Sequence, residues 1–462
     1  MSTVVVIGAG ISGLSCALNL ADARPDLTIR VLEASDRLGG TILTERSDGW
    51  VCEAGPGDFV DRDPSTRRLI ERLNLSDELI TAGNAIRRRY IRHQGTLHSF
   101  PDSPTAVQKT KLLSEKGRLR FQFSPVLPAV REDQTVSEFA AAHLGDEAAS
   151  VLLDPIVAGI YAGNPNELSA RSVLPRLVNL AESGRRVCDA LIGQGQGKLG
   201  QGSMISISGG MGRLIEALET ELRDRVERNR PVVSITRGIG NWRVGVGGDN
   251  PEVIEADAVV STLHGPAATH LLGSLNPEIE ENLKEIPSAP VAVVHLGFNK
   301  KDLQRALDGF GYLIPSSEGG PVLGVKWTTS IFPKGRAPEG HVLMQVYVGG
   351  TRDPELATDE AGSILAARKE IAETLHIETK PVHVRVFTHR VGIPQYLRGH
   401  IKRVTAIESA LSSLPGIYLA GTSLHGVGIN ACTTQSEEIA KKIVSTLPAK
   451  VASTNQAHLS LA

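Results

Sequence analysis

The chain has 462 residues, of which 41% are hydrophobic and 22% charged, so it is long enough for two or three domains with a sizeable buried core. A formal net charge of -2 and an aromatic content of 4% argue against nucleic acid as a partner, because they supply neither a basic surface nor a stacking platform. The four cysteines lie far apart without a C-x-x-C motif, which predicts free thiols and argues against a disulfide reductase or a cysteine metal site. No run approaches the roughly 18 uncharged apolar residues of a membrane span.

The N-terminal stretch has the order of elements of a nucleotide-binding fold. Thr3–Ile7 is a β-branched run, typical of a strand buried on both faces. Residues 8–13 (GAGISG) follow at once and lead into Leu14–Ala23, which has the small and apolar residues of a helix packed on a sheet. A second apolar run, Thr28–Leu32, ends at Glu33, 20 residues after the last glycine of the turn. Strand, glycines, helix, strand and acid in this order predict a dinucleotide site, whereas a lone G-x-G-x-x-G can be an accidental turn.

Each residue of the turn has a physical role. Gly8 allows the tight turn, Gly10 lets the backbone approach a pyrophosphate, and Gly13 permits close packing of helix against strand. The N-terminus of the helix would face the negative charge of the phosphates. Glu33 can accept hydrogen bonds from both ribose hydroxyls and would repel the 2′-phosphate of NADP.

The residues after this acid indicate which nucleotide binds. Glu33 opens the sequence EASDRLGG, which resembles the E-x-x-x-R-x-G-G extension of the FAD-dependent amine oxidase superfamily. In that superfamily the arginine and the paired glycines wrap the FAD diphosphate, so the resemblance implies this role for Arg37, Gly39 and Gly40. Thr41 stands where the superfamily usually has arginine or an aromatic residue, so one contact departs from the pattern. Without the resemblance, the arginine would be a surface charge and the glycines a turn.

A second nucleotide domain is not expected. Gly209–Gly212 precedes a helix-like stretch but lacks the flanking βαβ frame, so the sequence predicts no separate NADPH domain. The electrons of the flavin should therefore pass to oxygen or to a small acceptor such as a quinone.

Changes of pattern along the chain predict three regions. Residues 92–202 combine helical spacing of apolar and charged residues with several prolines and few strand-like runs, which indicates a helical insertion. Later segments are richer in strands, and Gly416–Gly421, a Gly-rich loop and a helix over Thr434–Ser445 return to the nucleotide site. We expect an α/β fold, α+β overall, with three parts. These are a Rossmann-like FAD-binding domain assembled from the discontinuous segments 1–80, 203–270 and 403–447, a mixed-sheet substrate domain from 81–91 and 271–402, and a helical lobe at 92–202, followed by a disordered tail at 448–462.

Later motifs resemble the protoporphyrinogen oxidase family. Residues 53–59 (EAGPGDF) resemble the segment of that family that passes the flavin ring, and residues 158–169 (AGIYAGNPNELS) resemble its A-G-x-x-A/G-G-N/D…L-S loop. Residues 309–316 (GFGYLIPS), the pair Gly349-Gly350 and residues 393–400 (IPQYLRGH) complete the set. The C-terminal GVGINAC at residues 426–432 also matches, with Ala431 where the family generally has aspartate. These motifs cover nearly the whole chain in the correct order.

The resemblance implies an FAD enzyme that oxidises protoporphyrinogen IX to protoporphyrin IX on the pathway to haem. Six electrons would leave in three two-electron steps, each as a hydride to the flavin, and three O2 would become three H2O2. Because the cofactor carries the hard chemistry, we expect no catalytic side chain and no metal site. The residues expected to contact FAD are Gly8, Ala9, Gly10, Ser12, Gly13, Glu33, Ala34, Arg37, Gly39, Gly40, Thr41, Gly55, Pro56, Gly57, Val232, Thr262, Gly421, Val427, Gly428 and Ile429.

Four side chains and one loop are candidates for binding the tetrapyrrole. Arg89 lies where the family places a propionate-binding arginine, and a planar guanidinium suits a bidentate carboxylate contact; the alternative is a solvated charge run. Leu313 and Tyr347 match the family's sandwich around the ring, with core packing as the alternative. The loop at Gly163 would bring backbone close to the ring, unless it is a simple turn. Lys326 replaces an apolar residue of the family, and we expect it either to pair with an extra carboxylate of a more acidic porphyrinogen or to be solvent-exposed.

Other reactive side chains are expected to be structural. His389, His400 and His425 are dispersed and form no acid–base dyad. Cys432 lies near the predicted flavin loop, but its neighbours do not resemble the covalent attachment site of monoamine oxidases, so we expect FAD to bind non-covalently.

Several alternatives stay open. The same chemistry on coproporphyrinogen III, which carries four propionates, would give coproporphyrin III. An amine oxidase, a carotenoid-type desaturase and a redox-silent FAD scaffold are more distant alternatives. The mixed basic and apolar segment Thr110–Val130 suggests peripheral membrane contact, with a soluble amphipathic segment as the alternative. We expect a cytoplasmic protein, peripheral on the cytoplasmic membrane or on the mitochondrial inner membrane in a eukaryote, and a homodimer is an open alternative for its assembly.

Overall fold

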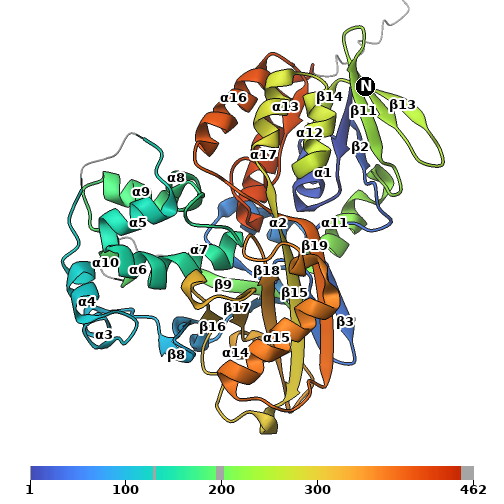
Figure 1. Ribbon diagram of the computed structural model, residues 1–462. Helices are drawn as coiled ribbons and strands as arrows, with labels where there is room; N and C mark the ends of the chain where they lie inside the picture. The colour runs from blue at the N-terminus through green and yellow to red at the C-terminus, as the bar shows by residue number, and fades with distance from the viewer. Residues whose placement is uncertain (1, 128–131, 194–201, 449–462) are drawn as a thin grey trace, which may run out of the picture.

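The structure is a computed structural model that describes residues 2–127, 132–193 and 202–448. Its upper part in Figure 1 is built around a five-stranded parallel sheet in the order β10-β2-β1-β14-β20. The strands are β1 (Thr3–Ile7), β2 (Thr28–Leu32), β10 (Val226–Glu227), β14 (Ala258–Ser261) and β20 (Ile417–Leu419). The first two strands predicted from the sequence are confirmed to the residue.

Helices cover both faces of this sheet. One face carries α1 (Ile11–Ala23), α11 (Gly212–Leu222) and α17 (Ile429–Thr446), and the other is near α12 (Gly265–Gly273), α13 (Pro277–Lys284) and α16 (His400–Ser412). Alternate residues of β1 join the two cores: Val4 and Val6 pack with the first set, and Val5 and Ile7 pack with the second. Successive side chains of a strand point to opposite faces, so an uninterrupted run of β-branched residues fills both cores at once.

A small antiparallel sheet lies on the second face. It consists of β11 (Val232–Arg237), β12 (Trp242–Val246) and β13 (Glu252–Ala256), in that order. Trp242 is buried in the core with α12, and its indole Nε1 donates a hydrogen bond to Pro415 O at 2.9 Å. Residues 232–259 therefore form strands and hairpins, in line with the strand-rich later segments expected from the sequence.

The lower part of the molecule is a seven-stranded mixed sheet in the order β19-β15-β18-β17-β16-β7-β8 (Figure 1). Its strands are β7 (Tyr90–His93), β8 (Thr96–Ser99), β15 (Ser288–Asn299), β16 (Gly311–Leu313), β17 (Val322–Lys326), β18 (His341–Gly349) and β19 (His383–Pro394). All neighbours pair antiparallel except β16 and β7, which are parallel. The helix α15 (Glu360–Leu375) packs on one face of this sheet, in a core that includes Tyr90, Tyr312 and Val325.

The helical lobe contributes no strand to the parallel sheet. It holds α3 (Pro104–Lys109), α4 (Glu115–Gln122), α5 (Val136–Leu144), α6 (Asp146–Ala148), α7 (Asp154–Tyr161), α8 (Ala170–Val173), α9 (Pro175–Glu182) and α10 (Val187–Leu191), with a π-helical turn at Ala149–Leu153. The helical pattern predicted from Arg92 onwards begins only after β8, because Arg92 and His93 continue β7 and the next strand pairs with it. The short strands and the turn between them are too brief to show a period in the sequence.

Short sheets connect the two large ones. The hairpin of β3 (Thr44–Ser47) and β4 (Trp50–Glu53) precedes the sheet β5-β9-β6, formed by Phe59–Asp61, Ser203–Ile207 and Leu79–Thr81. The helix α2 (Pro64–Arg72) follows β5 and contacts α17. The strand β9 begins at Ser203, directly after the region predicted to be helical.

The C-terminal helix begins earlier than predicted. α17 starts at Ile429 instead of Thr434, because Ile429 and Cys432 are buried and extend the apolar face of the helix into what looked like a Gly-rich loop. Gly428 is its N-cap residue. The tail expected at 448–462 lies outside the described residues except for Pro448.

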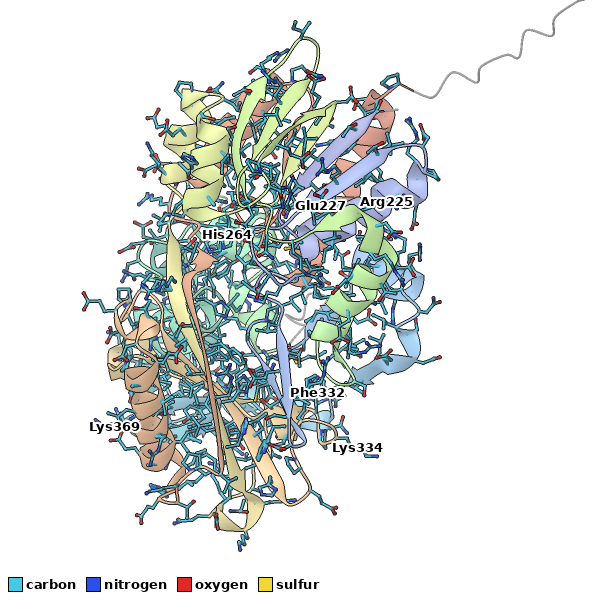
Figure 2. The ribbon with its side chains drawn as sticks, turned by 90° about the vertical axis from the view of Figure 1, so that its right-hand side faces the viewer. Arg225, Glu227, His264, Phe332, Lys334 and Lys369 are labelled. Carbon is cyan, nitrogen blue, oxygen red and sulfur yellow. The ribbon has the colours of Figure 1, made fainter. Side chains whose placement is uncertain are left out.

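The expected α/β, α+β architecture is confirmed, since the parallel sheet collects strands from four distant parts of the chain. Figure 2, turned by 90°, shows Glu227 of β10 in the upper region, Lys369 of α15 beside the lower sheet, and His264 between them. The ring Nε2 of His264 lies 3.3 Å from Val391 O of β19, so the regions touch there. Within the described residues, none of the helices has the length and apolar character needed to cross a membrane.

The IPQY…GH motif joins the lobe, the long strands and the nucleotide loops. Gln395 Nε2 donates to Tyr161 O at 2.8 Å, at the end of α7. The Tyr396 hydroxyl donates to Thr422 O at 2.5 Å and accepts from Gly426 N at 2.8 Å. Its ring is 1% exposed and stacks on His400 with 4.0 Å between the centroids. The motif is therefore a structural junction.

Replacing Tyr396 by Phe should lower the apparent melting temperature of the protein. The change removes both hydrogen bonds and leaves Thr422 O and Gly426 N without this partner, which costs about 1–3 kcal/mol. Differential scanning calorimetry would measure the shift. Tyr418→Phe is the matched control, because the Tyr418 hydroxyl makes an exposed contact of 3.3 Å; equal melting temperatures for both variants would contradict the prediction.

Candidate active site

The loops expected to hold the nucleotide meet at one edge of the parallel sheet. β1, β2, β14 and β20 run in the same direction, so the residues that follow them share that edge: Gly8, Glu33, Thr262 and Gly421. Thr262 Oγ1 donates to Ile7 O at 2.9 Å, which ties the end of β14 to the glycine turn. In open parallel sheets the ligand crevice lies outside the carboxyl ends of the strands, as here.

The glycine turn leaves room on one side only. Gly8 has φ +97°, a left-handed conformation that favours glycine. A Cβ on Gly13 would lie 2.0 Å from Gly8 O, so only glycine lets α1 start this close to β1. A Cβ on Gly10 would meet nothing nearer than Gly40 Cα at 4.0 Å, so the outer side of the turn is open. The turn therefore packs tightly inward and offers backbone outward, which fits a pyrophosphate.

Glu33 is fixed beside this turn by three hydrogen bonds. Its Oε2 accepts from Ala9 N at 2.9 Å, and its Oε1 accepts from Ser35 N at 2.9 Å and Ser35 Oγ at 2.8 Å. The neighbouring Ala34 is exposed. A half-buried carboxylate at the end of the second strand, with lone pairs left over, suits a ribose diol.

The extension after Glu33 folds over the turn. Gly39 N donates to Ala9 O at 2.8 Å, and Gly10 and Gly39 form a β-bridge. Arg37 is exposed and contacts only Leu38 O, at 3.5 Å, among the described residues. The arginine is therefore free to reach a diphosphate lying along the turn.

Two helix N-termini point into the crevice. α1 begins after Gly10 and α17 after Gly428, and neither N-cap residue supplies a side-chain hydrogen bond. The side of Gly428 where a Cβ would lie has no atom within 4 Å, and Val427 beside it is half-buried. Uncapped N–H groups and the helix dipole favour an anion at both positions. The residues present therefore fit the diphosphate and ribitol chain of FAD.

The remaining predicted cofactor residues lie around this crevice. Gly55 packs so closely on Thr41 that a Cβ would lie 2.3 Å from Thr41 O, which brings Gly55, Pro56 and Gly57 beside the extension. Ser12 and Ile429 are buried at the starts of the two helices. Val232 opens β11, two residues after Arg230, whose N donates to Glu33 O at 2.8 Å.

Strand register places predicted substrate residues on one face of the seven-stranded sheet. Leu313 pairs with Gly324, and Gly324 pairs with Tyr347. Lys326 lies two residues beyond Gly324 and therefore on the same side of β17. Gly324 has no side chain between Leu313 and Tyr347, which are both half-buried. We call the face that carries Leu313, Gly324, Lys326 and Tyr347 the site face.

Arg89 joins this face through Phe310. Arg89 precedes Ile91, the partner of Leu313, by two residues, and it is exposed. Its guanidinium carbon lies 5.5 Å from the centroid of the Phe310 ring, and Lys326 Nζ lies 5.9 Å from the same centroid. No carboxylate among the described residues pairs with Arg89. The sequence reasoning missed Phe310, whose ring gathers both cations by cation–π attraction.

Lys326 is buried, so the alternative that it is solvent-exposed is wrong. Its side chain is 9% exposed and its ammonium forms an ion pair with Asp58, whose side chain is 14% exposed. Burial alone would lower the pKa of Lys326, but the adjacent Asp58 carboxylate outweighs it, and the pKa is raised above its ordinary value. Lys326 is therefore a charged group within the site, already paired with Asp58. We call the segment Glu53–Asp58 the flavin-side segment.

The loop at Gly163 packs on protein. A Cβ on Gly163 would lie 2.1 Å from Gln395 Oε1 and 2.8 Å from Leu168 Cδ1. Gly159, one turn earlier on α7, instead lies against Leu313, where a Cβ would be 2.7 Å from Leu313 Cδ2. Gly159 is exposed on its other side, so it is a lobe residue at the site face that the sequence reasoning missed.

Side chains of the site face fasten the segment that links it to the nucleotide crevice. His295 Nε2 lies 2.9 Å from Glu53 O, and His389 Nε2 lies 2.8 Å from Ala54 O, so each ring donates a hydrogen bond to a backbone carbonyl. Ser206 Oγ donates to Gly57 O at 2.6 Å. Burial lowers the pKa of His295 to about 4, which keeps its ring neutral near pH 7.

The other histidines also have backbone or surface partners. His400 Nε2 lies 2.9 Å from Leu424 O, and burial lowers its pKa to about 4. His425 Nε2 lies 2.8 Å from the exposed Glu408 carboxylate. Cys432 is buried on α17, where burial raises the pKa of its thiol. None of these three groups is placed as an acid–base pair with another.

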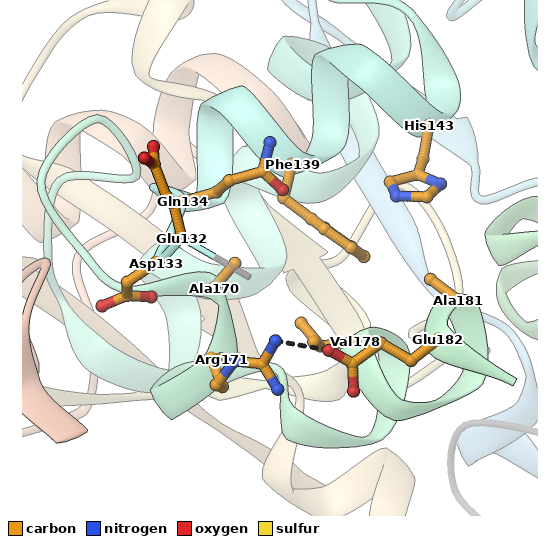
Figure 3. A pocket seen from close by; sticks show the side chains of 10 residues that line it. All are labelled: Glu132, Asp133, Gln134, Phe139, His143, Ala170, Arg171, Val178, Ala181 and Glu182. Atoms are coloured by element: carbon orange, nitrogen blue, oxygen red, sulfur yellow. Dashed lines mark hydrogen bonds and ion pairs between the residues drawn. The ribbon is translucent and has the colours of Figure 1, made fainter. Parts of the chain in front are cut away.

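Two further cavities lie near the lobe. In the pocket of Figure 3, charged side chains already have partners. Arg171 forms an ion pair with Glu182, and Asp133 accepts hydrogen bonds from Ser169 Oγ and Gly399 N, both at 2.7 Å. The other, which we call the basic cavity, lies between the η2 turn at Asn84–Arg87, β8 and α3. Its cationic side chains are Arg87, Arg88, Arg89, Lys109 and Lys111. Arg88 is neutralised by Asp308, while the other four have no ion-pair partner among the described residues.

Replacing Glu33 by Ala should weaken FAD binding by about 10- to 100-fold, because hydrogen bonds from a ribose to a charged group are worth about 1.5–3 kcal/mol. Titration of the apoprotein with FAD, followed by quenching of flavin fluorescence, would measure the Kd. Asp36→Ala, three residues further along the same loop and exposed, should leave it unchanged. A Kd unaffected by the Glu33 change would contradict the ribose role.

Comparison with known proteins agrees with this geometry. A family model described as flavin containing amine oxidoreductase matches residues 11–454. The coproporphyrinogen III oxidase of Bacillus subtilis (strain 168) is 31% identical over 461 aligned positions, covering 94% of this chain and 96% of the relative. The protoporphyrinogen oxidase of Homo sapiens is 31% identical over 484 positions, covering 96% and 99%. A crystal structure of a protein from Exiguobacterium sp. 255-15 superposes with a TM-score of 0.83 at 27% identity, covering 96% and 99%.

The family model spans the site face and the lobe and begins within the glycine turn, and the two relatives cover 94% and 96% of the chain. They also confirm FAD as the cofactor that the crevice fits. The chain therefore belongs to the flavin-containing amine oxidoreductase family, and it is an FAD-dependent oxidoreductase.

Proposed function

We propose that this enzyme oxidises a porphyrinogen to the corresponding porphyrin in haem biosynthesis, with protoporphyrinogen IX as the substrate. The observation that carries the proposal is the site face, where Leu313 and Tyr347 flank Gly324 and Arg89 lies nearby without a carboxylate partner. Two apolar or aromatic walls with a gap between them suit a ring system, and a free guanidinium suits a propionate. Relatives named protoporphyrinogen oxidase, about 30% identical over nearly their whole length, support it.

FAD, when bound, supplies the acceptor for two electrons, transferred as one hydride, in each of three successive oxidations. O2 is the proposed final acceptor, giving three H2O2 for each porphyrin. The residues of the chain bind and orient the substrate and exclude water. Leu313 and Tyr347 hold the ring, Arg89 is the proposed contact at its edge, and Lys326 lies on the same face in an ion pair with Asp58. The flavin-side segment is held by hydrogen bonds from His295 and His389, which fix the distance between this face and the nucleotide crevice.

A second candidate substrate is coproporphyrinogen III. It carries four propionates, and the basic cavity adjoining Arg89 offers three further cations, Arg87, Lys109 and Lys111, which lack an ion-pair partner among the described residues. Lys326 adds no net charge to the site, because it is paired with Asp58. The Bacillus subtilis relative is named coproporphyrinogen III oxidase. These observations favour a more acidic substrate, whereas the apolar walls suit both.

A porphyrin-fluorescence assay in air distinguishes the two substrates. The purified protein would be supplied with protoporphyrinogen IX and coproporphyrinogen III in separate reactions. A higher kcat/KM for protoporphyrinogen supports the first candidate, and a higher value for coproporphyrinogen supports the second. Oxidation of neither, with the flavin loaded, would contradict the porphyrinogen function and leave only the FAD oxidoreductase.

Replacing Arg89 by Ala should raise KM about 10- to 100-fold with a smaller effect on kcat, because the lost charged hydrogen bonds to a propionate are worth about 1.5–3 kcal/mol. Steady-state kinetics with the preferred porphyrinogen would measure both constants. Arg243→Ala, an exposed arginine on β12, is the control and should match the wild type. A KM unchanged by the Arg89 substitution would refute the propionate role.

We also propose that the protein is cytoplasmic and attaches peripherally to the cytoplasmic membrane through the lobe. Leu119, Phe123 and Val126 are exposed by 51%, 70% and 53%, beside the exposed Lys116. Apolar side chains flanked by cations favour an anionic lipid surface. Residues 128–130 of the proposed segment lie outside the described residues.

Substituting Leu119 and Phe123 together by Ser should abolish sedimentation with vesicles that contain anionic lipid. Wild-type protein should sediment with such vesicles and remain in solution with neutral ones at physiological ionic strength. The control replaces Val253, exposed by 54% on β13, by Ser. If the wild type ignored vesicles of every composition, the attachment would be wrong.

A further inference from the structure

Asp58 lies where the flavin-side segment meets the site face. It follows Gly55-Pro56-Gly57, which packs on Thr41 of the nucleotide loop, and its carboxylate forms the ion pair with Lys326 of β17. Asp58 also interacts electrostatically with Tyr347 and Arg336, and Glu53 interacts with the same two groups. The Asp58 side chain is 14% exposed, so the ion pair does not bury it completely.

The other acid and base groups at this junction are occupied. The Glu53 carboxylate accepts from Thr44 Oγ1 at 2.6 Å and Met211 N at 2.9 Å, and it lies 3.3 Å from Arg336. His295 and His389 point their Nε2 atoms at backbone carbonyls. Among the described residues, Lys326 is the only side chain that donates to Asp58, so one carboxylate oxygen of Asp58 remains without a partner. Asp58 is therefore the base with free lone pairs at the site face.

Porphyrinogen oxidation needs such a base. In each two-electron step, a bridging C–H bond breaks and its electron pair leaves with the hydrogen to the oxidised flavin. The ring then carries a positive charge, which is lost when a pyrrole N–H or, once in the three steps, the fourth bridging C–H gives up its proton and its bonding pair forms the new double bond. A carboxylate beside the ring both stabilises that charge and accepts the proton.

We propose that Asp58 is this proton acceptor, and that Lys326 positions it. The inference rests on the proposed function. In each of the three steps, the Asp58 carboxylate takes one proton from the ring and becomes a neutral carboxylic acid, which releases the proton to solvent before the next step. Two of the three protons come from pyrrole N–H groups and one from the fourth bridging carbon, so the product keeps two N–H groups and one hydrogen on each bridge. Lys326 holds the carboxylate towards the site face through their ion pair.

The test compares Asp58→Asn with the wild-type holoenzyme. Asparagine keeps the size and cannot accept the proton, so kcat should fall about 100-fold or more. The acid limb of the kcat–pH profile should disappear. The Kd for the product porphyrin, measured from the shift of its Soret band, and the FAD content should change by less than threefold. Asp22→Asn, in a surface ion pair with Arg72 on α2, is the matched control and should behave as wild type.

Two further variants separate the base from its support. Lys326→Met removes the cation that holds Asp58 in place, so kcat should fall while KM and porphyrin affinity are kept. Asp58→Glu should restore part of the lost kcat, because it returns a carboxylate to the same segment.

Three results would overturn the inference. If Asp58→Asn kept kcat within threefold of wild type together with its acid limb, Asp58 would not be the base. If porphyrin affinity and FAD content fell in proportion to kcat, the ion pair would be structural only. Wild-type protein that oxidises no porphyrinogen would overturn the proposed function and this inference together, whereas the first two results leave the proposed function intact.

Discussion

The buried carboxylate of Glu53 is the constraint that joins the nucleotide-binding region to the seven-stranded sheet. Its partners come from three places: Thr44 on the neighbouring strand β3, Met211 at the start of α11, and Arg336 in the loop before β18. Arg336 is only 2% exposed, and burial raises the pKa of Glu53 while it lowers the pKa of Arg336. Removing one member of such a pair leaves an uncompensated buried charge, at a cost of about 3–5 kcal/mol. Only the native arrangement of the three segments satisfies both groups.

The spacing between cofactor and substrate follows from this junction. Once Glu53 is fixed, the next residues run along the edge of the site face, where His295 and His389 donate to successive carbonyls. Burial lowers the pKa of His295 to about 4, and a neutral imidazole costs far less to bury than a charged one. The hydrogen bond from His295 to Glu53 O therefore persists near pH 7.

What could be predicted from the sequence depended on how local the interactions are. The glycine turn and Glu33 are adjacent in sequence, so one contiguous stretch revealed strand, helix and ligand together, and the structure matches it closely. Leu313 was found through a motif and lies on the site face by register. The contact of Lys326 with Asp58 joins residues 268 positions apart, and no periodicity records such a pair. Gly159 of α7 was missed for the same reason, since its neighbour Leu313 is far away in the sequence, on β16 of the seven-stranded sheet.

The strand order of the parallel sheet also bears on how the protein is made. Its central pair, β1 and β14, joins residues about 255 positions apart in register, and β20 adds a strand near residue 417. Such non-local pairing gives a high contact order, and its loop-closure entropy must be met before the contacts form. The lobe, by contrast, is continuous in sequence and can fold while the chain is still being synthesised. A truncated chain that ends before β20 would therefore keep a folded lobe and the N-terminus of α1 but lack the N-terminus of α17 and thus a complete FAD crevice, which makes cofactor binding a report on completed synthesis.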